Sequence, residues 1–165
     1  MPRRTTGRSP QPADPDLLPV DEGRSEAVLL AVDDLQTATA DLGWPEATGL
    51  CDGLVDALAH LLVDLADGAA HPSPRPTVVG AIGGSPRPVD HAACRAAAAS
   101  LRRVAPTFEG SPAPWAGGAG SVCTELAELV DQVADLDRTG RLTLAHKGVV
   151  LRRLHALQRR LQGLG

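Results

Sequence analysis

Aromatic residues are almost missing from this chain of 165 residues: they make up 2 % of it, as two tryptophans, one phenylalanine and no tyrosine. The strands of sandwiches and barrels draw on aromatic and β-branched side chains. Modules that stack nucleic-acid bases need aromatic side chains at their surface. The scarcity of aromatics therefore disfavours an all-β fold and a base-stacking surface, and the abundant alanine and leucine are typical of helices.

Cysteine is also scarce. Cys51, Cys94 and Cys123 are odd in number and widely spaced, and they form no CxxC motif. This pattern argues against a disulfide framework and against a zinc knuckle. Each cysteine falls on or beside an apolar helical stripe, so we expect three reduced, buried thiols in a cytoplasmic protein. The sequence predicts no cofactor and no metal ligand set.

Long apolar runs and a strong excess of one charge are missing as well. No stretch approaches the roughly 18 apolar residues that predict a membrane helix. Arg3 and Arg4 are followed by polar residues rather than by the apolar core of a signal peptide, so we expect no export. The net charge is −4, and the chain as a whole therefore lacks the basic signature of a polyanion-binding protein.

Residues 1–20 hold five prolines among polar residues. Such a segment buries too little apolar surface to offset the entropy lost on ordering, so we expect a disordered arm. The remainder, 21–165, is predicted to form a single helical domain with irregular loops at about 69–88 and 105–120.

Five segments of that domain carry apolar residues at alternating four- and three-residue spacing, which places them on one face of a helix. Cap residues, glycines and prolines bound the segments. The predicted helices run from Ser25 to Leu42, from Pro45 to Ala66, from Val89 to Val104 with Pro106 as a stop, from Ser121 to Gly140, and from Thr143 onward. The predicted fold class is therefore all-α: a five-helix bundle of two tight antiparallel hairpins plus a linker-flanked middle helix. Six leucines should be buried in its core: Leu54, Leu58, Leu126, Leu129, Leu154 and Leu157.

Charge is segregated along the chain. The segment 25–67 holds nine acidic residues and no basic one, and the segment 141–165 holds six basic residues and no acidic one. The candidate interaction surface is the basic last helix, with Arg152, Arg153, Arg159 and Arg160 as two pairs one heptad apart. We expect these arginines to pair internally with the acidic hairpin. The alternatives are an acidic face of a protein partner, nucleic-acid phosphates and an anionic membrane surface.

Three weaker patterns have plain structural explanations. Asp52, Asp56, His60 and Asp64 stand one helical turn apart and could hold a divalent metal, but we interpret them as a solvated polar face. Residues 77–87, TVVGAIGGSPR, resemble the first phosphate loop of NAD(P)H-dependent FMN reductases, and we interpret them as a proline-flanked loop because no second strand is predicted. Arg141 and His146 resemble the Arg-x4-His motif of HEPN-type helical ribonucleases, and the neighbouring Thr143 explains the same residues as a helix cap.

These observations predict a small non-catalytic helical protein that acts as a protein–protein interaction or accessory module, through an unknown protein partner or through self-association. The alternative is a nucleic-acid-associated accessory protein that uses the basic C-terminal helix. A helical enzyme such as a HEPN-like ribonuclease ranks third.

Overall fold

The computed structural model describes residues 22–72 and 85–164. The predicted arm, 1–20, and most of the strand-like run at 77–87 lie outside these ranges. Within them the chain forms five helices and no strand: α1 (Glu22–Thr37), α2 (Pro45–Ala66), α3 (His91–Glu109), α4 (Ala116–Arg138) and α5 (Leu144–Gln162). The all-α, five-helix prediction is confirmed.

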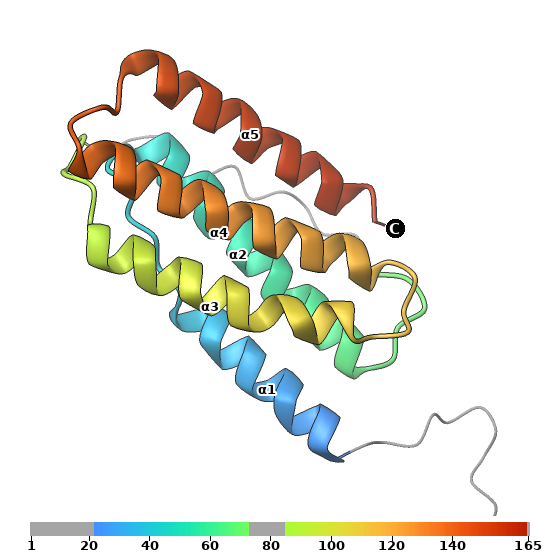
Figure 1. Ribbon diagram of the computed structural model, residues 1–165. Coiled ribbons are helices and arrows are strands. Elements are labelled where there is room, and N and C mark those ends of the chain that lie inside the picture. The colour runs from blue at the N-terminus through green and yellow to red at the C-terminus, as the bar shows by residue number, and fades with distance from the viewer. Residues whose placement is uncertain (1–21, 73–84, 165) are drawn as a thin grey trace, which may run out of the picture.

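The helices form a ring in the order α1, α2, α5, α4, α3 and back to α1, and α2 also packs against α4 across the ring (Figure 1). The two predicted hairpins are supported in part: α1 packs against α2 and α4 against α5, but residues 38–44 make the first link longer than the predicted tight turn. The most extensive packing joins α3 to α4. Because the ring has five helices, an odd number, its neighbouring helices cannot all be antiparallel. The one parallel pair is α2 and α5, and α3 and α4 carry the chain between them (Figure 1).

The core is built from the apolar stripes that the sequence predicts. All six leucines expected in the core are at most 3 % exposed. Two of the three aromatic residues, Phe108 and Trp115, are buried as well, and the indole Nε1 of Trp115 donates to the carbonyl of Ala69 at 3.2 Å. The few aromatic side chains are thus used for packing, as expected of large apolar groups.

Helices α2 and α5 begin where the sequence predicts. Pro45 occupies the first turn of α2, where its missing N–H costs no hydrogen bond. The hydroxyl of Thr143 accepts from the N–H of His146 at 3.3 Å, and His146 Nδ1 accepts from the Thr143 N–H at 3.3 Å. This reciprocal pair is a capping box, with histidine in the place usually held by glutamate.

Helix α1 ends earlier than predicted, at Thr37 rather than Leu42. The hydroxyl of Thr37 donates to the carbonyls of Asp33 and Asp34, at 3.1 and 3.0 Å. It thereby provides a hydrogen-bond donor for carbonyls in the last turn of the helix. Residues 38–42 then run without helical structure, and the carbonyl of Asp41 accepts from Asp90 N at 3.1 Å. Leu42 is nevertheless fully buried. The apolar spacing therefore predicts the burial of Leu42 correctly, although the backbone there is not helical. Its carbonyl at Asp41 instead binds the N-cap residue of α3.

Helix α3 continues through Pro106, which was predicted to end it. Proline removes one N–H from the helical ladder, and the cost falls near the C-terminal end of α3. The following turn carries Phe108, which is completely buried. The packing of Phe108 favours one more turn of helix and outweighs the local preference of proline to stop it.

Helix α4 begins at Ala116, five residues before the predicted cap Ser121. Its first turns contain glycines, which disfavour a helix in isolation. A Cβ on Gly120 would lie 2.9 Å from Glu109 Cγ, and a Cβ on Gly118 would lie 2.6 Å from Leu164 Cδ2. These glycines let α3 and the end of α5 approach α4 closely. The predicted loop 105–120 therefore shrinks to the residues between α3 and α4, 110–115.

Candidate functional site

The four arginines of α5 divide into two pairs with different surroundings. Arg160 Nη1 lies 2.7 Å from Glu125 Oε1, and its Nη2 donates to Ser121 Oγ at 2.9 Å. Arg153 Nη1 donates to Gln132 Oε1 at 3.1 Å. Glu125, Ser121 and Gln132 all belong to α4. Among the described residues, the side-chain partners of these two arginines are therefore on α4, and not on the acidic hairpin that the charge segregation suggested.

Arg152 and Arg159 point elsewhere. Both are exposed, and neither side chain makes an ion pair or hydrogen bond within the described residues. We call the exposed residues Val149, Arg152, His155 and Arg159 the outer face of α5, because their spacing of three and four residues places them on one side of the helix. This face offers two guanidinium groups, each able to bind a carboxylate or a phosphate in a forked geometry.

The polar side chains predicted on one face of α2 do not converge. No group of three or more histidine, cysteine, aspartate or glutamate side chains converges within the described residues. His60 Nδ1 lies 3.5 Å from Asp56 Oδ2, Asp64 is buried, and Asp52 is exposed. Partial desolvation and, next, the charge of Asp41 raise the pKa of the Asp52 carboxyl.

The Arg141 and His146 pattern has a structural role at the start of α5. His146 Nδ1 lies 2.9 Å from Thr143 Oγ1 and accepts from the Thr143 N–H, so this ring nitrogen belongs to the cap. The backbone N–H of Arg141 donates to the carbonyl of Leu136 at 2.7 Å, and its side chain is exposed. His146 therefore belongs to the cap of α5, and Arg141 to the turn that follows α4.

The three cysteines are free and buried, as predicted. Burial raises the pKa of each thiol, to about 12 in Cys51, Cys94 and Cys123. Nearby carboxylates, Asp52 for Cys51 and Asp90 for Cys94, raise it further. Because the thiolate is the nucleophile and the metal ligand, these neutral thiols are packing groups at physiological pH.

Two contacts between distant residues have no signal in the sequence. His91 Nε2 lies 2.7 Å from Asp137 Oδ2, which ties the start of α3 to the end of α4. Lys147 Nζ lies 5.4 Å from the ring centroid of Trp44, which joins the first turns of the parallel helices α2 and α5. Both pairs join the ends of helices that are distant in sequence.

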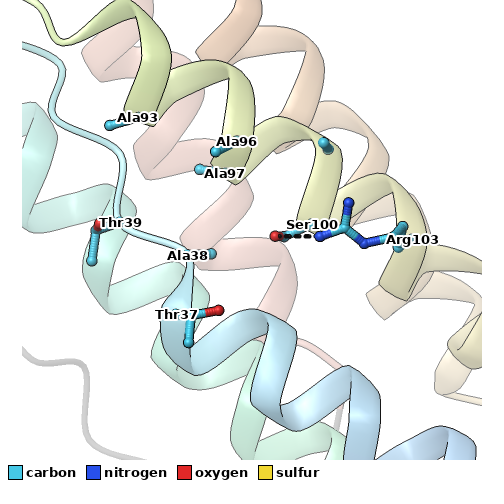
Figure 2. Close-up of a pocket in the computed structure, with 9 residues that line it drawn as sticks. Thr37, Ala38, Thr39, Ala93, Ala96, Ala97, Ser100 and Arg103 are labelled. Carbon is cyan, nitrogen blue, oxygen red and sulfur yellow. Dashed lines mark hydrogen bonds between the residues drawn. The ribbon is translucent and has the colours of Figure 1, made fainter.

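A hollow of about 240 Å³ separates the end of α1 from α3 (Figure 2). Its basic group, Arg103, is already engaged: Nε and Nη2 bind the two carboxylate oxygens of Asp34 at 3.2 and 3.0 Å, and Nη2 also donates to Ser100 Oγ at 3.0 Å. The remaining wall consists of small side chains. The lining residues are Thr37, Ala38, Thr39, Ala93, Ala96, Ala97, Ala99, Ser100 and Arg103.

A wider, open hollow of about 490 Å³ follows α4. It mixes three arginines with three carboxylates, and two of these arginines are paired within it, Arg102 with Asp131 and Arg138 with Asp135. Its charges therefore largely cancel. The outer face of α5, by contrast, carries two positive charges whose side chains have no partner among the described residues.

No protein-family model, no curated protein and no solved structure matches this chain. In the described residues no helix has the length and apolar character needed to cross a membrane.

Proposed function

We propose that this protein is a non-catalytic, cytosolic interaction module that binds an acidic protein surface through the outer face of α5. The observation that carries the proposal is the division of the α5 arginines. Arg153 and Arg160 bind side chains of α4, whereas the side chains of Arg152 and Arg159 are exposed one heptad apart and have no partner among the described residues. Buried neutral thiols support a reducing compartment.

An acidic protein fits this face better than nucleic acid does. The overall charge of the chain is −4, and α4 beside α5 exposes Glu128 and Asp135. Nucleic-acid binding draws on a broad basic surface, and two arginines on a chain with a net charge of −4 do not provide one. A protein partner need offer only two carboxylates at matching spacing.

The test is affinity capture from lysate with three forms of the tagged chain: wild type, Arg152→Gln/Arg159→Gln, and the matched control Arg153→Gln/Arg160→Gln. We expect partners that the wild type and the control retain and that the outer-face variant loses. Retention should fall with added salt, because screening weakens exposed charge pairs.

Nuclease treatment separates the two classes of partner. Capture that survives nuclease and depends on Arg152 and Arg159 supports the proposal. Capture that disappears with nuclease would instead establish the nucleic-acid alternative. Equal capture by all three forms would show that the outer face of α5 binds nothing and would end the proposal.

A further inference from the structure

Two leucines on α1 face away from the bundle. Leu29 and Leu30 are 69 % and 63 % exposed, whereas Val28 and Leu35 of the same helix are in the core. Single exposed apolar residues are ordinary on protein surfaces. Here two adjacent leucines give α1 a second apolar side, which is characteristic of a helix covered from two directions.

Two carboxylates frame these leucines. Glu26 lies four residues before Leu30 and Asp33 three residues after it, so all three share one side of α1. We call Glu26, Leu29, Leu30 and Asp33 the outer face of α1. Neither Glu26 nor Asp33 has an ion pair among the described residues, whereas Asp34 turns toward α3 and binds Arg103. This face is thus an apolar centre between two acids.

The outer faces of α1 and α5 match in charge and in spacing. Glu26 and Asp33 are seven residues apart, as are Arg152 and Arg159, and seven residues span about 10.5 Å of helix. Between the two arginines α5 carries His155 and the half-buried Ala156, with no acidic residue. The leucines could pack between the arginines while both acids meet a guanidinium group.

The two faces cannot meet within one chain. In the ring α1 touches α2 and α3, and α5 touches α2 and α4, so the two helices lie on opposite sides of the bundle (Figure 1). We propose that the outer face of α1 in one copy docks on the outer face of α5 in a second copy. This inference rests on the proposed function and names its acidic partner as the chain itself.

Such a contact has a definite assembly geometry. Because the two faces lie on opposite sides of the bundle, two copies cannot bury both pairs of faces at once. The interface is therefore heterologous, and an open assembly always leaves one α1 face and one α5 face unoccupied. The mass of the assembly should therefore increase continuously with concentration, or stop at a closed ring, rather than at a two-fold dimer.

The experiment is sedimentation velocity over a concentration series, with the wild type, Glu26→Arg/Asp33→Arg and Arg152→Glu/Arg159→Glu. We expect the wild type to associate and each charge-reversed variant alone to associate about 100-fold more weakly or not at all, because like charges then oppose each other. An equimolar mixture of the two variants should associate again, since a reversed α1 meets a reversed α5. Arg153→Gln/Arg160→Gln, which leaves both faces intact, is the control that should associate like wild type.

Three results would overturn the inference: a wild type that stays monomeric throughout, a mixture that does not associate, or an Arg152→Glu/Arg159→Glu variant that associates as wild type does. The last result would point to a symmetric contact between two α1 helices. A monomeric wild type whose capture of other proteins still depends on Arg152 and Arg159 would end this inference and leave the proposed function standing.

Discussion

At the scale of a single residue, Gly43 connects three segments of the chain. Its φ is +87°, a region that L side chains rarely adopt. Its N–H donates to Asp41 Oδ1 at 3.0 Å, and its carbonyl accepts from Arg87 N at 2.7 Å. A Cβ at this position would lie 2.7 Å from the carbonyl oxygen of Arg87. The link between α1 and α2 thus also fixes the approach to α3.

We predict that Gly43→Ala lowers the free energy of unfolding by more than about 2 kcal/mol, because it combines a left-handed backbone with a clash against main chain. Gly68→Ala is the matched control: its φ is +68°, and no atom lies within 4 Å of its Cβ position. It should cost only the backbone term, about 1 kcal/mol. Urea unfolding measures both, and equal losses would show that the contact with Arg87 does not matter.

Helix α5 shows how one element serves two purposes. Val150, Leu154 and Leu157 face the core, Arg153 and Arg160 reach sideways to α4, and the outer face remains open. The pairs with α4 are exposed, so each contributes only about 0–1 kcal/mol. Removing Arg153 and Arg160 should therefore lower the stability of the fold, whereas removing Arg152 and Arg159 should not.

We therefore expect Arg153→Gln/Arg160→Gln to melt slightly below wild type, with a larger difference at low salt than at high salt, because salt screens exposed pairs. Arg152→Gln/Arg159→Gln should melt like wild type or slightly above it, since it relieves repulsion on a helix with no acidic residue. Calorimetry at two salt concentrations compares them. The reverse order of melting temperatures would show that the outer-face arginines are the structural ones.

At the scale of the whole molecule, α5 closes the ring between α4 and α2. It is the last helix of the chain and packs in parallel with α2, which is far away in sequence (Figure 1). Burial of its apolar stripe is the main driving force for this docking, because the hydrophobic effect scales with apolar area removed from water. Leu154, which is fully buried, lies at the middle of that stripe.

Leu154→Ala should lower the free energy of unfolding by about 2–5 kcal/mol, through lost burial and the cavity that remains. Leu144→Ala, on the same helix, removes a side chain that is 86 % exposed and should change stability by less than about 0.5 kcal/mol. Denaturant unfolding measures both variants. A small effect of Leu154→Ala would mean that α5 is a loosely attached element rather than a member of the ring.

The sequence by itself determined what depends on neighbouring residues. Apolar residues at helical spacing gave all five helices and the six buried leucines. Pro45 and Thr143 marked the starts of α2 and α5, because a helix start is satisfied by groups within one turn of it. The burial of the cysteines followed from the same apolar stripes.

Only the tertiary structure decided what depends on packing between distant segments. The burial of Phe108 explains why α3 continues past Pro106. The close approach of α3 and Leu164 explains the glycines in the first turns of α4. The pair of His91 and Asp137 joins residues 46 positions apart. The candidate site shows the same division. Spacing found the α5 arginines, but it could not tell which of them α4 would occupy, because a helical pattern defines the faces of a helix and only the neighbouring helices determine which face is covered.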